Sequence, residues 1–141
     1  MRSWRFGVVA MIALIGLWVP AAALEDGDRA ATRSVIDRQI EAFRRDDASA
    51  AYSLAAPSIR RIFPDEQGFI DMVRRSYRPV YRPRSYEFGD ARETGTGLDQ
   101  AVRIQDEDGA DWDAIYSLER QSDGSWQVSG CALVKRPGTS V

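Results

Sequence analysis

The hydrophobic period of the chain changes near residue 85, from helical spacing to strict alternation. Before this point apolar residues recur three or four positions apart, as in Ile36, Ile40 and Phe43, which is the spacing of an amphipathic helix. After it apolar and polar residues alternate, which predicts strands with one buried face. Because helices precede strands instead of alternating with them, the sequence predicts an α+β fold with helices packed on one face of an antiparallel sheet.

Three N-terminal helices are predicted in the first half. The first begins near Arg29, and Asp47 is placed to cap a second, short helix. Residues 58–63, after a proline, add another helical piece. Asp65 is a good N-cap for the third helix, which carries an apolar stripe that starts at Phe69.

About four strands are predicted from residue 85 onward, in a curved antiparallel meander. The pairs Asp108-Gly109 and Asp123-Gly124 lie between alternating runs and are typical hairpin turns. The loop at residues 95–97 separates the first strand from the second. In the last strand, alternation assigns one face to Trp126, Val128, Gly130, Ala132 and Val134.

The first 23 residues have the three-part layout of a secretory signal peptide. Arg2 and Arg5 precede an apolar run at residues 6–19, and small residues follow up to Ala23. We therefore expect cleavage after Ala23 and a periplasmic or secreted protein, which meets the membrane only through this segment. An uncleaved N-terminal anchor is the alternative.

The remaining 118 of the 141 residues fit one domain. We expect a short tail at residues 24–29, a single α+β domain at residues 30–136 and a C-terminal tail at residues 137–141. Loss of Arg2 and Arg5 lowers the net charge from −2 to −4. A mildly acidic domain is a poor match for nucleic acid, because phosphate binding depends on accumulated positive charge.

The missing residue types narrow the chemistry. Histidine is absent and Cys131 is the only cysteine, which excludes Ser-His triads, histidine zinc sites and thiolate metal clusters. No intramolecular disulfide forms, and no cofactor or metal is expected. Cys131 lies in a strand-like run, which favours a buried, inert thiol. An intermolecular bridge and a redox role are the alternatives.

Two segments carry a resemblance to known families. The run "VIDRQIEAFRRDDASAAYSLAAPSIRRIF" resembles the opening of nuclear-transport-factor-2-like domains, the superfamily that includes ketosteroid isomerase. More closely, "FIDMVRRSYRPVYRPRSYEFG" with "LERQSDGSWQVSGCAL" resembles the bacterial family named domain of unknown function 4864. The resemblance covers Ala30 to Lys135. It implies the cone-shaped, cystatin-like or nuclear-transport-factor-2-like α+β fold and brings no established reaction or catalytic residues.

The stretch "YRPVYRPRSY", residues 77–86, has two interpretations. Each proline disfavours helix at the arginine before it, so the stretch is typical of an extended connector whose tyrosines pack on the core and whose arginines pair with acids. The alternative is a cationic rim at the mouth of the cone, formed by Arg78, Arg82 and Arg84 with Arg74 and Arg75. Such a rim would bind a small anionic ligand through guanidinium groups.

Five acids gather in "DEDGADWD", residues 106–113. The spacing does not match the standard calcium loop, because Gly109 stands fourth where that loop wants its sixth residue and Ser117 stands at its twelfth. An acid-rich hairpin tip is the favoured interpretation, and we predict no metal site. Weak calcium binding stays open.

An exported, non-catalytic protein that binds a small molecule or a partner protein is the favoured function. The expected ligand is anionic or apolar, and the outer sheet face is the surface through which a homodimer would form. We expect the cone to be lined by Phe43, Phe69, Trp112, Tyr116 and Trp126. An isomerase- or hydrolase-like enzyme with an interior carboxylate is the alternative, although Glu87, Asp113 and Glu119 fall in the polar phase of the strands. A structural envelope protein with a filled cone is a third hypothesis.

Overall fold

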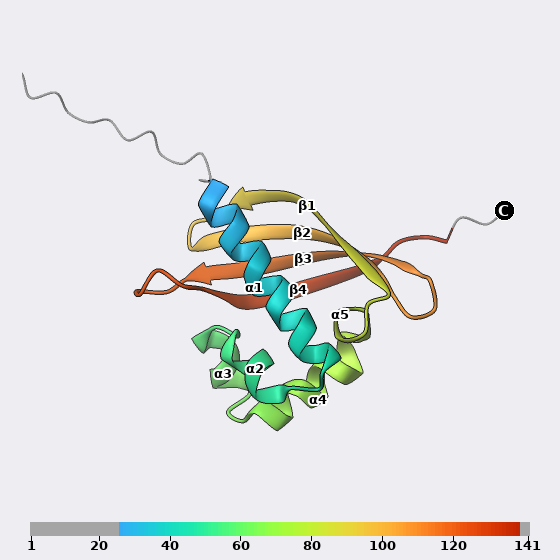
Figure 1. Cartoon of the computed structure of the whole chain (residues 1–141), viewed down its shortest axis with the longest axis horizontal. Coiled ribbons are helices and arrows are strands. Elements are labelled where there is room, and N and C mark those ends of the chain that lie inside the picture. The colour runs from blue at the N-terminus through green and yellow to red at the C-terminus, as the bar shows by residue number, and fades with distance from the viewer. Residues whose placement is uncertain (1–25, 139–141) are drawn as a thin grey trace, which may run out of the picture.

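In a computed structural model of the chain, which describes residues 26–138, five helices precede one four-stranded sheet (Figure 1). The helices are α1 (Asp26–Arg44), α2 (Ala48–Ser53), α3 (Pro57–Ile62), α4 (Glu66–Ser76) and α5 (Arg78–Tyr81). The strands are β1 (Ser85–Glu93), β2 (Gly97–Gln105), β3 (Asp111–Arg120) and β4 (Trp126–Lys135). Each strand pairs antiparallel with the next in the chain. The α+β class and the four-stranded antiparallel sheet are confirmed.

The predicted signal peptide and the last three residues of the predicted C-terminal tail lie outside the described residues. The described part of the predicted N-terminal tail, residues 26–29, is helical, because α1 already begins at Asp26. None of the described helices has both the length and the apolar content needed to cross a membrane.

The helices cover one face of the sheet, and the core lies between the two layers. Figure 1 shows α1 running across the sheet, with α2, α3 and α4 gathered beyond β4. Alternate residues of β2 and β3 are buried under this layer, among them Leu98, Val102, Ile104 and Tyr116. From α1 the buried residues Ile36, Ile40 and Phe43 complete the core, as the helical spacing predicted.

Asp47 and Asp65 act as the predicted helix caps. The Asp47 carboxylate accepts the backbone N–H of Ala50 at 3.0 Å, and the Asp65 carboxylate accepts that of Gly68 at 2.7 Å. Each satisfies one of the N–H groups that have no partner within their own helix.

Five helices are present where three were predicted: the helical piece expected at residues 58–63 is a separate helix, α3, and α5 was not predicted. In the stretch "YRPVYRPRSY", residues Arg78–Tyr81 form α5 instead of an extended connector. Pro79 lies in the first turn, where a helix needs no N–H donor from it. Arg78 is therefore helical, although the proline after it disfavours that conformation.

A bulge at Ser129 reverses the predicted phase of β4. Val128 pairs with Leu118 and Gly130 with Ser117, so Ser129 is an extra residue in the ladder. Beyond it Cys131 lies opposite Tyr116 on the helix-facing side, and Val134 is 64 % exposed. The assignment of Ala132 and Val134 to the same face as Trp126 and Val128 was therefore wrong.

The α2–α3 connector lies along the edge of β4 beside this bulge. The Val128 N–H donates to the Leu54 carbonyl and the Ala56 N–H donates to the Val128 carbonyl, both at 2.8 Å. The backbone N–H and carbonyl groups at an uncovered strand edge have no hydrogen-bond partner within the sheet. The connector therefore joins the helical layer to the sheet through the main chain.

The three predicted strand connections are present. Gly109 and Gly124, with φ of +82° and +86°, supply the left-handed conformation that each Asp-Gly turn needs. The loop between β1 and β2 ends at Gly97, the first residue of β2. The backbone of β3 lies so close to Gly97 that no side chain fits there. A Cβ at this position would lie 1.9 Å from the Leu118 carbonyl oxygen on β3.

We predict that Gly97→Ala lowers the free energy of unfolding by about 1–3 kcal/mol, the usual cost of forcing an extra methyl into filled space. Gly95→Ala is the matched control, since nothing lies within 4 Å of the Cβ it would add. Urea unfolding of both variants checks this. Equal midpoints for the two variants would contradict the close approach seen at Gly97.

Candidate functional site

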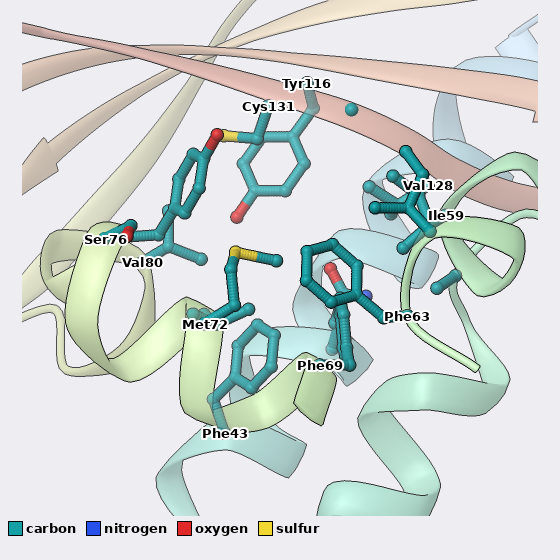
Figure 2. Close-up of a pocket in the computed structure, with 16 residues that line it drawn as sticks. Phe43, Ile59, Phe63, Phe69, Met72, Ser76, Val80, Tyr116, Val128 and Cys131 are labelled. Carbon is teal, nitrogen blue, oxygen red and sulfur yellow. The ribbon is translucent and has the colours of Figure 1, made fainter. Parts of the chain in front are cut away.

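A pocket of about 480 Å³ opens between the helical layer and strands β3 and β4 (Figure 2). The helical side contributes mainly apolar side chains, including Phe43, Ile59, Phe63, Phe69, Met72 and Val80. The sheet contributes Tyr116, Val128 and Cys131. This volume lies within the range of sites that hold small molecules, roughly 300–1,000 Å³.

The lining carries no charged side chain. Its polar groups belong to Gln39, Ser76, Tyr77, Tyr116 and Cys131. The buried Gln39 is tied to α2, because its amide nitrogen donates to the Ala51 carbonyl at 3.2 Å. Ser76 is exposed and marks the mouth of the pocket on the α4 side.

Ile62 marks the mouth on the α3 side. It is 68 % exposed, which is unusual for isoleucine, and α3 contains no buried residue. The helix is held by polar contacts instead: Arg60 donates to the carbonyls of Ser53 at 2.9 Å and Ala55 at 3.0 Å. The pocket therefore has one wall that is packed more lightly than the rest.

Phe69 is the centre of an aromatic cluster in the wall of the pocket. Its ring lies 6.2 Å from that of Phe43, 5.6 Å from Tyr52 and 6.4 Å from Phe63, measured between centroids. These tilted and edge-on arrangements are favourable for aromatic pairs. The Tyr52 hydroxyl also donates to the Phe63 carbonyl at 2.6 Å, so this wall is fixed by packing and by one strong hydrogen bond.

Tyr116 and Cys131 face the pocket from paired positions of β3 and β4. Figure 2 shows the Tyr116 hydroxyl pointing away from the strand into the pocket. Burial raises the pKa of Tyr116 well above its usual value, and it raises the pKa of the half-buried Cys131 thiol to about 12. Both groups are therefore protonated and neutral at pH 7.

The structure brings three of the five predicted lining residues together: Phe43, Phe69 and Tyr116 line the pocket. Trp112 and Trp126 do not, because they lie at the starts of β3 and β4. The indole N–H of Trp112 donates to Asp106 at 2.8 Å, and Trp126 lies under Arg120 at 5.7 Å. Alternation identified the correct face but not the position along each strand.

Sequence reasoning missed most of the remaining wall. Met72 belongs to the apolar stripe predicted from Phe69 onward and Ile59 to the helical piece predicted at residues 58–63, but neither pattern indicates a pocket. Cys131 faces the pocket only because of the bulge. A single sequence carries no signal for that bulge, because it forms where the α2–α3 connector meets β4.

The arginines of the predicted rim are engaged with the protein itself, and none lines the pocket. Arg78 binds Glu107 through two contacts of 3.1 and 3.2 Å. Arg84 donates to the Glu107 carbonyl at 2.8 Å. Arg82 donates to the Phe43 carbonyl and, at 2.8 Å, to Asp46. These contacts favour the interpretation in which the arginines pair with nearby acids.

Three of these arginines contact the ring of Tyr81. The guanidinium carbons of Arg82, Arg74 and Arg78 lie 4.3, 5.4 and 5.7 Å from its ring centroid, within the range of cation–π contacts. The Tyr81 hydroxyl donates to Asp46, which adopts a left-handed φ of 55° at the end of α1. The hydrogen bond from Tyr81 and then that from Arg82 lower the pKa of Asp46 to about 2.

The acidic tip between β2 and β3 is a hairpin turn held by Asp106. Its carboxylate accepts the backbone N–H groups of Asp108 and Ala110, both at 2.9 Å, besides the Trp112 indole. These three donors lower the pKa of Asp106, the indole most strongly. Within residues 26–138, no three His, Cys, Asp or Glu side chains gather to hold a metal ion.

The model of the family DUF4864, described as a domain of unknown function, matches residues 25–141. The chain belongs to the DUF4864 family. The resemblance to DUF4864 stated from sequence is thereby confirmed. Among curated proteins, no significant match to the chain was found.

The two segments that suggested DUF4864 have clear structural roles. The stretch "YRPVYRPRS" contains α5 and the arginines around Tyr81. The stretch "GSWQVSGC" contains the bulge of β4 and ends at Cys131 in the pocket wall. In this DUF4864 domain the distinctive residues thus build one structural cluster and one side of the pocket.

We predict that Asp46→Asn lowers stability at pH 5–7 and that the loss shrinks toward pH 2. The folded-state pKa of Asp46, about 2 against an ordinary 3.8, means that the ionised carboxylate stabilises the fold above pH 4 and stops doing so as the pH falls through 2. Asn also tolerates the left-handed backbone. Thermal unfolding from pH 2 to 7 checks this.

Asp90→Asn is the control for this test, since Asp90 is exposed on β1 and has no ion pair among the described residues. Its melting temperature should follow that of the wild type across the range. A constant offset of Asp46→Asn at every pH would show that the ionised carboxylate is not what stabilises the cluster.

The Cys131 thiol should react with a charged disulfide reagent at pH 8 at least about a hundredfold more slowly in the native protein than in urea. The thiolate is the reactive form, and a pKa of about 12 leaves very little of it. The rate of colour release under the two conditions measures this. Equal rates would contradict a buried, protonated thiol.

Proposed function

We propose that this protein is an exported, single-domain, non-catalytic binding protein that holds a small apolar molecule in the pocket between its helices and strands β3 and β4. The observation that carries the proposal is a pocket of about 480 Å³ whose lining is mostly aliphatic and aromatic and contains no charged side chain. Moving apolar surface from water into such a site is favourable by about 25 cal/mol per Å².

An apolar ligand is favoured over the anionic one because of where the arginines lie. Arg78, Arg82 and Arg84 are bound to Glu107, Asp46 and main-chain carbonyls, and they are absent from the lining. An anion in the pocket would lose its water without gaining a cation, which is costly.

The enzymatic alternative needs a carboxylate base within reach of the ligand. The pocket lining includes none. Asp113 pairs with Arg136 at 2.8 Å, Glu87 is exposed, and Glu119 lies opposite Gln127 in the ladder. Binding without catalysis is therefore the function that this lining supports best.

Placement in the nuclear-transport-factor-2-like superfamily and export are parts of this proposal. Helices that precede a four-stranded meander, with a pocket between the two layers, support the cone-shaped fold. The charged, apolar and small-residue segments of residues 1–23 support a signal peptide and a periplasmic or secreted location.

The predicted homodimer stays a prediction. Ile115 on β3 and Val134 on β4 are 41 % and 64 % exposed, and they are the large apolar residues that an interface on the outer sheet face would bury.

The neutral dye N-phenyl-1-naphthylamine tests the binding proposal, because its fluorescence rises when it leaves water for an apolar site. We expect saturable binding to the purified protein and a dissociation constant at least about tenfold higher for Met72→Trp, a loss of about 1.4 kcal/mol. The larger side chain fills space that Met72 leaves open in the pocket.

Gln67→Trp is the matched control, since Gln67 lies on the same helix and is exposed. It should bind the dye as the wild type does, and both variants should keep the wild-type melting temperature. Absence of saturable binding to the wild type, or equal affinities for Met72→Trp and the wild type, would refute binding in this pocket.

A further inference from the structure

The Tyr116 hydroxyl is a buried polar group without a partner. Tyr116 is 1 % exposed, and its hydroxyl is the one buried side-chain polar atom in residues 26–138 that makes no hydrogen bond. Most buried polar groups in proteins are paired, and tyrosine usually places its hydroxyl where a partner is available. This exception lies at the wall of the pocket (Figure 2).

The protein offers this hydroxyl no obvious partner of its own. Gln39, the other buried polar side chain of the lining, is bound to the Ala51 carbonyl. The main-chain groups near Tyr116 are engaged in the ladders that join β3 to β2 and β4. Cys131, opposite Tyr116 on β4, has only a weakly hydrogen-bonding sulfur.

The residues around this hydroxyl limit the chemical class of ligand group that can pair with it. Both Tyr116 and Cys131 are neutral, because burial raises the pKa of each. With no cation in the lining, a carboxylate or phosphate placed beside the hydroxyl would be a buried, unpaired charge. A pure hydrocarbon would leave the hydroxyl without a hydrogen bond.

Met72, on α4, lines the same pocket as Tyr116. It is half-buried, and Figure 2 shows it on the side toward which the hydroxyl points. Methionine has three rotatable bonds and a polarisable sulfur, so it adapts its shape to what lies beside it. Its side chain can therefore move aside when a ligand atom approaches the hydroxyl.

We propose that the Tyr116 hydroxyl donates a hydrogen bond to a single neutral oxygen, such as a carbonyl, on an otherwise apolar ligand. This inference deepens the proposed function and rests on it. The ligand class is then uncharged and amphipathic, with one oxygen acceptor held at the inner end of the pocket and a hydrocarbon body lying against Phe43, Phe69 and Val80. Tyr116 acts as the residue that selects this class.

Three probes with twelve carbons each test the proposal by displacement of N-phenyl-1-naphthylamine. Hexanophenone carries a neutral carbonyl, hexylbenzene has a methylene at that place, and 6-phenylhexanoate is charged at pH 7. For Tyr116→Phe we expect hexanophenone to bind about five- to tenfold more weakly than to the wild type, the usual effect of one neutral hydrogen bond. Hexylbenzene should change by less than about twofold, and 6-phenylhexanoate should bind most weakly to both proteins.

The outcomes separate this inference from the proposed function. If the wild type binds the dye and Tyr116→Phe changes hexanophenone no more than hexylbenzene, the hydrogen bond is refuted while the apolar pocket stands. If 6-phenylhexanoate binds the wild type more tightly than hexanophenone does, the neutral class is refuted. If the dye and all three probes fail to bind the wild type, the proposed function fails and the inference with it.

The stability of the ligand-free protein gives an independent readout. Tyr116→Phe removes a hydroxyl that has no partner, so its melting temperature should equal or exceed that of the wild type. Tyr52→Phe is the matched control, since it removes a hydroxyl that donates to the Phe63 carbonyl at 2.6 Å, and it should melt at a lower temperature. A similar loss for both variants would show that Tyr116 has a partner within the protein and would overturn the inference.

Discussion

The two backbone hydrogen bonds of Val128 determine how the helical layer meets the sheet. They bind residues 54–56 to the edge of β4, and the bulge at Ser129 follows directly. On one side of this junction the layers are joined main chain to main chain. On the other side the bulge turns Cys131 inward beside Tyr116, and helices α3 and α4 cover these residues without filling the space. The pocket therefore begins where the connector attaches, since Ala55 and Val128 both line it.

The charged residues serve a different purpose, which is to hold the helical layer together from outside. Tyr81 is buried with its ring among three guanidinium groups, and its hydroxyl is bound to Asp46 at the end of α1. Arg82 reaches the last turns of α1 as well, through the Phe43 carbonyl. The stretch "YRPVYRPRSY", whose composition suggested anion binding, thus connects α1, α4 and α5 through side-chain contacts. Since Phe43 also lines the pocket, these contacts support the site without entering it.

Features set by local chemistry could be predicted from the sequence, and features set by contacts between distant segments could not. Asp47 and Asp65 cap helices and the Asp-Gly pairs form turns, because each interaction spans only a few residues. The phase of β4 beyond Val128 depends on a segment about seventy residues earlier in the chain, so alternation alone wrongly extended the face of Trp126 and Val128 to Ala132 and Val134. The local bias against helix at Arg78 was likewise weaker than the packing of α5, which buries Pro79, Val80 and Tyr81.

The charged side chains lie outside the pocket, and this limits the chemistry available inside it. The carboxylates of Asp46, Asp106 and Asp113 all have pKa values below the ordinary one because donors bind them outside the pocket, so they are ionised and committed at neutral pH. Inside, burial keeps Tyr116 and Cys131 protonated. Proton transfer near pH 7 favours a group that titrates near that pH, and these two groups titrate far above it. Since what they offer instead is a neutral donor beside apolar walls, these two residues support the proposed binding of a molecule without proton transfer.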